Sequence, residues 1–239
     1  MIMPNRDTPV PRCLELALYT EHMLGKFPDN PRLVVLSARM REGSGVLEAA
    51  HLAHENEYRV LERTRIDVDF ENYLSDARVR RTRKLVELED GHAGGRIASQ
   101  VFFAGSLDMS RIQGDRQIDA MRTLEMRLRN VQDLWPGAAA ELAEIVMHRS
   151  RYGAALDARE ACKRRIVQLR LARDAAKERF LRLYAEIASL VQAEFPRDRK
   201  TQELFFRDAY ERRPAATPDN GGGEDDEPSD DPPDDPAGG

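Results

Sequence analysis

The feature that most constrains this chain is a long helical pattern that no proline interrupts. Between Pro136 and Pro196 there is no proline, and apolar residues recur at steps of three and four. These residues are Cys162, Ile166, Leu169, Ala172, Ala176, Phe180, Leu183, Ile187 and Leu190. Such steps place side chains on one helix face, as in the seam between two packed helices. The pattern predicts a helix over 136–195, which would reach roughly 90 Å at 1.5 Å per residue and needs a partner helix along its length.

A second long helix is predicted in the first half of the chain. It begins at Asn30-Pro31, an N-cap residue followed by a proline at the first helical position. We expect the helix to cover 31–90, with a bend or a tight turn at 42–45 as the open alternative. The alternative arises because each of the two glycines there costs about 1 kcal/mol relative to alanine. The glycines within 91–95 are expected to end this helix.

Shorter elements are predicted around the two long helices. One helix is expected over 11–27 and another over 115–133, and residues 100–105 are expected to form a loop or a short extended segment. Charged residues make up 33% of the chain and aromatic residues 6%, which favours long helices with a narrow apolar seam over a compact core. The predicted fold class is all-α, with long antiparallel coiled-coil-like helices and short end helices.

The order of these elements occurs twice along the chain. Phe27-Pro28 matches Trp135-Pro136, and further pairs match at offsets of 108 and 110: Arg41 with Arg149, Leu61 with Leu171, and Phe70 with Phe180. An internal two-fold duplication, with repeats over 11–104 and 115–208, is one of two open interpretations; chance matching is the other. In the duplicated protein the first long helix would cover the seam of the second. The covering residues would be Leu61, Phe70, Tyr73, Ala77 and Leu88.

The two ends of the chain differ from its body. Residues 1–10 are predicted to be a flexible arm, residues 11–213 an all-helical body, and residues 214–239 a disordered acidic tail rich in Pro, Gly and Asp. The tail holds nine acidic residues, no basic residue and no large apolar side chain, so it cannot bury enough area to offset its ordering entropy. Without these nine, 33 of the 42 acids remain against 37 bases. The predicted body is therefore mildly basic.

Glu48, His51 and His54 are the candidate metal ligands. A Glu and a His three residues apart share a helix face, and two such pairs with two further glutamates form the di-iron sites of helical bundles. A second pair is missing at the corresponding place in the second half of the chain. The favoured interpretation is a polar helix face, so no metal and no cofactor are predicted.

Two basic clusters are the candidate nucleic-acid contacts. They comprise Arg78, Arg80, Arg81 and Arg83 in the first long helix, and Lys163, Arg164 and Arg165 in the second. Clustered Arg and Lys can displace the counterions of a phosphate backbone. Acidic residues interleave both clusters, however, as on an ordinary solvated helix face. Contact with nucleic acid is therefore the less favoured interpretation.

The functional hypothesis follows from these patterns together. The sequence has no phosphate-binding loop, no nucleophile elbow and no HExxH motif, so we predict that the protein is not an enzyme and takes no small-molecule substrate. Two cysteines without a CxxC partner indicate a reducing compartment, and the lack of a signal peptide or a long apolar run predicts a cytoplasmic protein without a membrane span. The leading hypothesis is a non-catalytic helical scaffold or adaptor that contacts a protein partner or itself. The alternatives are a nucleic-acid-associated protein with an autoinhibitory acidic tail, and a metal-binding bundle at Glu48, His51 and His54.

Overall fold

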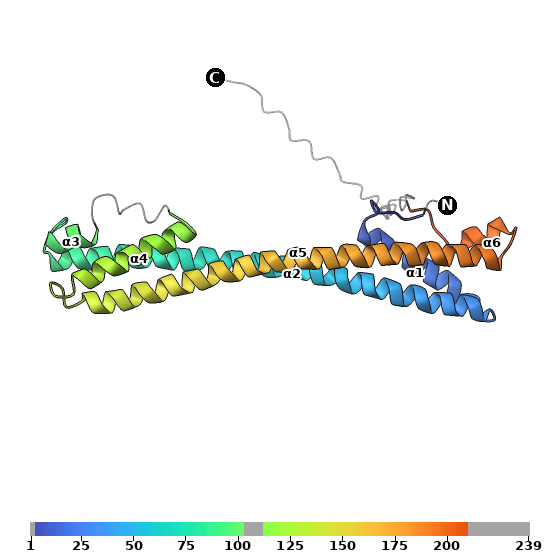
Figure 1. Ribbon diagram of the computed structural model, residues 1–239, viewed down its shortest axis with the longest axis horizontal. Helices are drawn as coiled ribbons and strands as arrows, with labels where there is room; N and C mark the ends of the chain where they lie inside the picture. The colour runs from blue at the N-terminus through green and yellow to red at the C-terminus, as the bar shows by residue number, and fades with distance from the viewer. Residues whose placement is uncertain (1–2, 103–111, 210–239) are drawn as a thin grey trace, which may run out of the picture.

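The computed structural model describes residues 3–102 and 112–209, and in these ranges the secondary structure is entirely helical. The helices are α1 (Val10–Gly25), α2 (Pro31–Glu89), α3 (Arg96–Val101), α4 (Asp115–Asn130), α5 (Ala138–Glu194) and α6 (Arg199–Leu204). The long helices α2 and α5 lie side by side and antiparallel, with α1 and α6 at one end and α3 and α4 at the other (Figure 1). The all-α prediction is confirmed. The predicted tail, 214–239, lies outside the described residues.

The start of α2 follows the predicted capping chemistry. The Asn30 side-chain oxygen accepts hydrogen bonds from the backbone N–H groups of Arg32 and Leu33, at 3.0 and 3.3 Å. The helix then continues through the glycines of 42–45 without a break, so the alternative of a tight helix-to-helix turn there is wrong. Packing of α2 against α1 and α5 over this stretch outweighs the low helix propensity of glycine.

The segment 100–105 was only partly predicted. Gln100 and Val101 form the end of α3 rather than a loop or an extended segment, and Val101 is fully buried against α4 and α5. Burial of this apolar residue favours the extra helical turn. Residues 103–105 lie outside the described part of the chain.

The glycines inside α2 differ in what surrounds them, and this difference gives a first prediction. A methyl group added to Gly45 would meet open space, whereas one added to Gly43 would overlap the Cδ2 methyl of Leu183. We expect Gly45→Ala to raise the free energy of unfolding by about 0.5–1 kcal/mol, because alanine loses less backbone entropy in a helix. Chemical denaturation measures the change. Gly43→Ala is the control, and an equal gain at both positions would contradict the close approach of Leu183 to Gly43.

Buried residues of α2 recur every seven positions. Leu33, Met40, Leu47, His54, Leu61, Val68, Ser75 and Thr82 are all buried. Leu61 was predicted in this set, but the predicted Phe70, Tyr73 and Leu88 are 57–76% exposed. Their places are taken by smaller or polar residues such as Ser75. On α5 most of the predicted seam is at least half-buried, but Ala172 and Leu190 are exposed, and the half-buried Arg173 takes the place of Ala172. The seam of the pair is thus more polar than the apolar pattern predicts.

The two ends of the rod hold the large hydrophobic clusters. At one end, α1 and residues following α6 pack on Phe180, Tyr184 and Ile187 of α5. At the other, α3 and α4 pack around Val86, Trp135 and Ile145. Between them the described helices form only small clusters, one of which contains Leu61, Cys162 and Ile166. In the part of the chain that the structure describes, the middle of the rod is therefore a helix pair without a third helix.

The two halves of the chain repeat the order of their elements. A helix of 16 residues precedes one of 59 and one of 6 in the first half, and the corresponding helices of the second half have 16, 57 and 6 residues. Arg41 of α2 pairs with Glu21 of α1, and Arg149 of α5 pairs with Glu125 of α4. The internal duplication remains a prediction. Its offset of 110 is not supported by burial, because it matches Leu61, which is 6% exposed, with Leu171, which is 66% exposed.

Residues 3–9 of the predicted flexible arm contact the body. The Arg6 side chain pairs with Glu178 of α5, and Lys177 donates a hydrogen bond to the Arg6 carbonyl at 2.6 Å. Thr8 is buried and bonds with Asn5 in a turn that precedes α1. These contacts place the start of the chain against α5.

Candidate functional site

Helices α1 and α4 cover the same side of the α2–α5 pair. Because the two long helices twist around each other, this side is defined by its residue positions rather than by one direction in space. Arg41 contacts α1, and Asp76, 35 residues further along α2, accepts a hydrogen bond from Gln117 of α4. On α5, Arg149 contacts α4, and Tyr184, again 35 residues further, bonds with Thr20 of α1. Because the buried positions recur every seven residues, positions 35 apart lie on the same side of the pair. We call the opposite side the open face.

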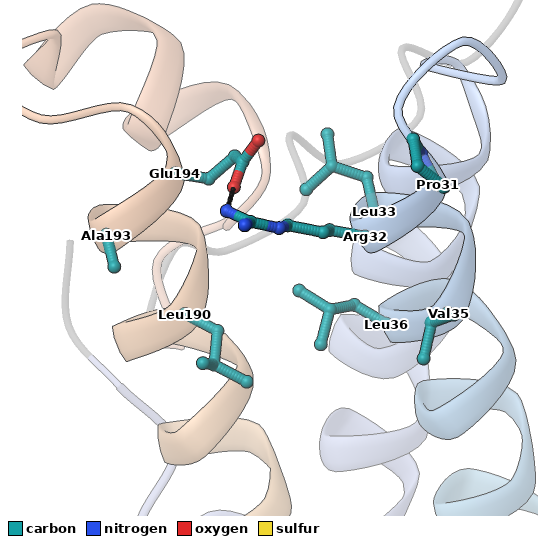
Figure 2. A pocket seen from close by; sticks show the side chains of 8 residues that line it. All are labelled: Pro31, Arg32, Leu33, Val35, Leu36, Leu190, Ala193 and Glu194. Carbon is teal, nitrogen blue, oxygen red and sulfur yellow. Dashed lines mark hydrogen bonds and ion pairs between the residues drawn. The ribbon is translucent and has the colours of Figure 1, made fainter.

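A groove lies on the open face near the start of α2. It encloses about 530 Å³ and is lined by Pro31, Arg32, Leu33, Val35, Leu36, Leu190, Ala193 and Glu194. Figure 2 shows Leu33, Leu36 and Leu190 pointing into the space between the two helices, while Arg32 reaches across to Glu194. Successive residues of a helix turn by 100°, so Val35 lies on the other side of α2 from Ser37, which bonds to α1. The groove is therefore apolar at its base, and it lies on the side of α2 away from α1.

A second hollow continues the groove toward the middle of the rod. Its volume is about 310 Å³, and it is lined by Arg39, Glu42, Gly43, Val46, Ala176, Arg179, Phe180 and Leu183. Gly43 lets Leu183 approach the α2 backbone closely. Arg39 pairs with Glu186 across the helices at 2.8 Å. We call these two hollows together the furrow; the ion pairs Arg32–Glu194 and Arg39–Glu186 cross it.

The open face continues beyond the two hollows. Residues that follow at intervals of seven positions lie on the same side of the helix and can be assigned to it. Arg32, Arg39 and Val46 line the hollows at this spacing, and it continues through Ala53 to Val60. On α5 the same side carries small exposed residues: Ala154, Ala158, Ala161, Ala172, Ala175 and Ala193. The open face thus carries a few larger apolar residues of α2 and alanines of α5, with charged residues such as Arg39, Glu42 and Arg179 among them.

The candidate metal ligands are not brought together. Glu48 is exposed, His51 is half-buried, and His54 is buried with its Nδ1 3.3 Å from Glu55 and 3.4 Å from Arg173. The His54 ring packs edge-on against Tyr58, with ring centroids 5.0 Å apart. Across 3–102 and 112–209, no three His, Cys, Asp or Glu side chains group in a way that could hold a metal ion. The spacing of these three residues therefore does not gather them into one cluster of ligands.

Most of the candidate nucleic-acid contacts have acidic partners. Arg78 pairs with Glu141, Arg83 with Glu87, Lys163 with Glu160, and Arg165 with Glu57. Arg80, Arg81 and Arg164 are exposed, and among the described residues none of them has an ion-pair partner. The two clusters lie at different levels, since Arg165 is opposite Glu57 and that residue is 21 positions, or roughly 30 Å, before Arg78 on α2. The structure does not join them into one basic patch.

A buried ion pair between the long helices was missed by the sequence reasoning. Arg78 Nη2 lies 2.6 Å from Glu141 Oε1, and Thr82 donates a hydrogen bond to Glu141 Oε2 at 2.8 Å. Both charged side chains are only 9% exposed, and Arg78 also lies 3.5 Å from Glu144. Arg78 had been predicted as a surface contact. The signal that could have identified the pair is the position of Glu141, which continues the apolar spacing of α5 into its first turn.

Burial shifts the pKa of several titrating groups in the helix-packing regions of the rod. Burial raises the pKa of Tyr184 to about 12, and the hydroxyl of this residue lies 3.1 Å from Thr20 Oγ1. Burial also raises the pKa of the Cys13 thiol and lowers the pKa of His148. A raised thiol pKa disfavours the nucleophilic thiolate. These shifts reflect helix packing rather than a paired acid and base.

Two further findings concern the chain as a whole rather than one site. None of the helices in the described ranges is long and apolar enough to cross a membrane. In comparisons of sequence and structure, no protein family, curated protein or solved structure matched the chain.

Proposed function

We propose that this protein is a non-catalytic helical scaffold or adaptor, a coiled-coil rod that binds other protein surfaces through its open face. The observation that carries the proposal is the furrow between α2 and α5, with Leu33, Leu36 and Leu190 at its base and no helix of the described chain over it. Contiguous apolar surface with a polar rim is characteristic of protein interaction sites. A reducing, cytoplasmic location is part of the proposal, and the two unpaired buried cysteines are compatible with it.

The form of the furrow indicates what it would accept. On the other side of the same two helices, α1 packs through Leu16 and Leu24 in the way that a third helix completes a bundle. An apolar helix face laid in the furrow would add a fourth helix by the same ridge-and-groove packing. The exposed Val35 and Val46, at 58% and 51% exposure, would then be covered. This supports a role in holding helical partners along a rod.

A photo-crosslinking experiment tests the proposal in the native cell. A photoreactive phenylalanine analogue is placed at Val46 on the open face or, as the control, at Leu52, which is equally exposed at 51% but does not line the furrow. We expect protein adducts from position 46, at least several-fold more abundant than from position 52. Equal adduct yields from the two positions would contradict a contact surface at the open face.

A further inference from the structure

We propose that the open face binds a second copy of this chain, with α2 of each copy lying over α5 of the other. The inference rests on the proposed function and names the partner of the same surface. The two copies would be related by a two-fold axis along the rod, so that both α1 ends lie together. Such an interface is isologous: both copies use the same face, and each contact of α2 with α5 of the second copy occurs twice.

Side-chain size along the open face supports this arrangement. Leu61 packs with Cys162, and because α2 and α5 are antiparallel, the preceding residues Val60 and Ala161 step in opposite directions and lie within about 3 Å of each other along the rod. Val68 packs with Leu156. By the same reasoning, Phe70 and Ala154 share a level.

Rotation about an axis along the rod leaves the position of each residue along the rod unchanged, so residues at one level in one copy also meet at that level between copies. It places Val60 over Ala161 of the second copy and Phe70 over Ala154 of the second copy. Larger residues of α2 would thus meet alanines, which allow two helices to approach closely and to interdigitate. Placing α5 over α5 would instead bring alanines against alanines and leave gaps.

Charge on the open face favours the same pairing. In the span 151–182, the α5 side carries Arg151, Arg165, Arg179 and Arg182 and no acidic residue at these positions. The α2 side carries Glu42, Asp67 and Arg63 over the matching levels. Arg165 is paired with Glu57 of its own chain. A pairing of α5 with α5 would still oppose the other three arginines with three arginines, and like charges across an interface are costly. The pairing of α2 with α5 places Glu42 near Arg179 and Arg182 of the second copy.

The area of the open face is sufficient for a stable dimer. Helix α2 has 59 residues, which span about 88 Å, and two helices about 10 Å wide give a footprint on the order of 1,700 Å². A stable interface buries roughly 800 Å² per partner. Half of the open face is therefore enough. The middle of the rod, where the pair has no third helix, lies within it.

Sedimentation equilibrium of the full chain tests the proposal, because it measures mass independently of molecular shape. We expect twice the chain mass of 27.2 kDa at micromolar concentration. Val60→Arg places a positive charge against the basic α5 of the second copy and should weaken the dimer at least on the order of a hundredfold. Leu171→Arg is the control, because this residue is exposed but lies outside the open face. Circular dichroism should show unchanged helix content in both variants.

Mixing variants tests the orientation of the copies. Ala161→Glu is made in a separate chain and mixed with Val60→Arg, so that the new charges meet only between copies. We expect the mixture to recover the dimer mass. A monomeric wild-type chain would overturn the dimer, and equal weakening by Val60→Arg and Leu171→Arg would overturn its assignment to the open face. Failure of the mixture to recover would overturn the pairing of α2 with α5. Adducts from position 46 with a monomeric chain would overturn this inference and leave the proposed function intact.

Discussion

Ile187→Ala is expected to lower the free energy of unfolding by about 2–5 kcal/mol, the range measured for buried Ile→Ala changes. Ile187 is fully buried in the cluster that joins α1, α2 and α5. Removing its side chain leaves a cavity, because the surrounding helices are held by Phe180, Tyr184 and Val191 on the same face and cannot collapse freely. Urea denaturation followed by circular dichroism measures the change.

Ile66→Ala is the matched control for this prediction. The Ile66 side chain is 62% exposed and points away from α5, so the same deletion should change stability by at most about 0.5 kcal/mol. Equal losses at the two positions would contradict the assignment of the α2–α5 seam. The two variants therefore test which side of each helix is packed, and not only that the helices form.

The lengths of the helices could be predicted from the sequence because their end signals are local. Asn30 accepts backbone hydrogen bonds at the start of α2, and the first glycine after its end, Gly91, adopts φ of 72°, a left-handed conformation suited to glycine. The seam could be predicted less well. Apolar spacing points to Phe70 and Tyr73, which are exposed, and misses Ser75 and Thr82, which are fully buried. Polar residues in a seam carry no apolar signal, so only their seven-residue register could have identified them.

The candidate site depends on how α1 and α4 pack against the long helices, which the sequence pattern does not show. Which side of α2 remains uncovered follows from where α1 and α4 pack, and that is set by contacts such as Arg41 with Glu21. Once those contacts are known, the register assigns Val46 and Val60 to the open face. The basic clusters failed for a similar reason. A run of arginines does not reveal that Arg78 turns inward to Glu141 while Arg80 remains exposed.

The buried pair of Arg78 and Glu141 gives the second prediction of large effect. Glu141→Ala removes the carboxylate that accepts from both Arg78 and Thr82 and leaves the guanidinium group nearly buried. Breaking a buried pair in this way typically costs about 3–5 kcal/mol. Because Glu144 stays 3.5 Å from Arg78, we expect the lower part of that range, measured by urea denaturation.

A double variant separates the cost of an orphaned charge from the value of the pair. Arg78→Met with Glu141→Leu replaces both charges by apolar side chains of similar size, and such replacements are often neutral or stabilising. We therefore expect the double variant to recover most of the stability lost in Glu141→Ala. The exposed pair of Arg199 and Glu203 is the control, and Glu203→Ala there should have little effect. A double variant as unstable as Glu141→Ala would show that the ion pair itself stabilises this end of the rod, because the attraction would then exceed what an apolar contact supplies.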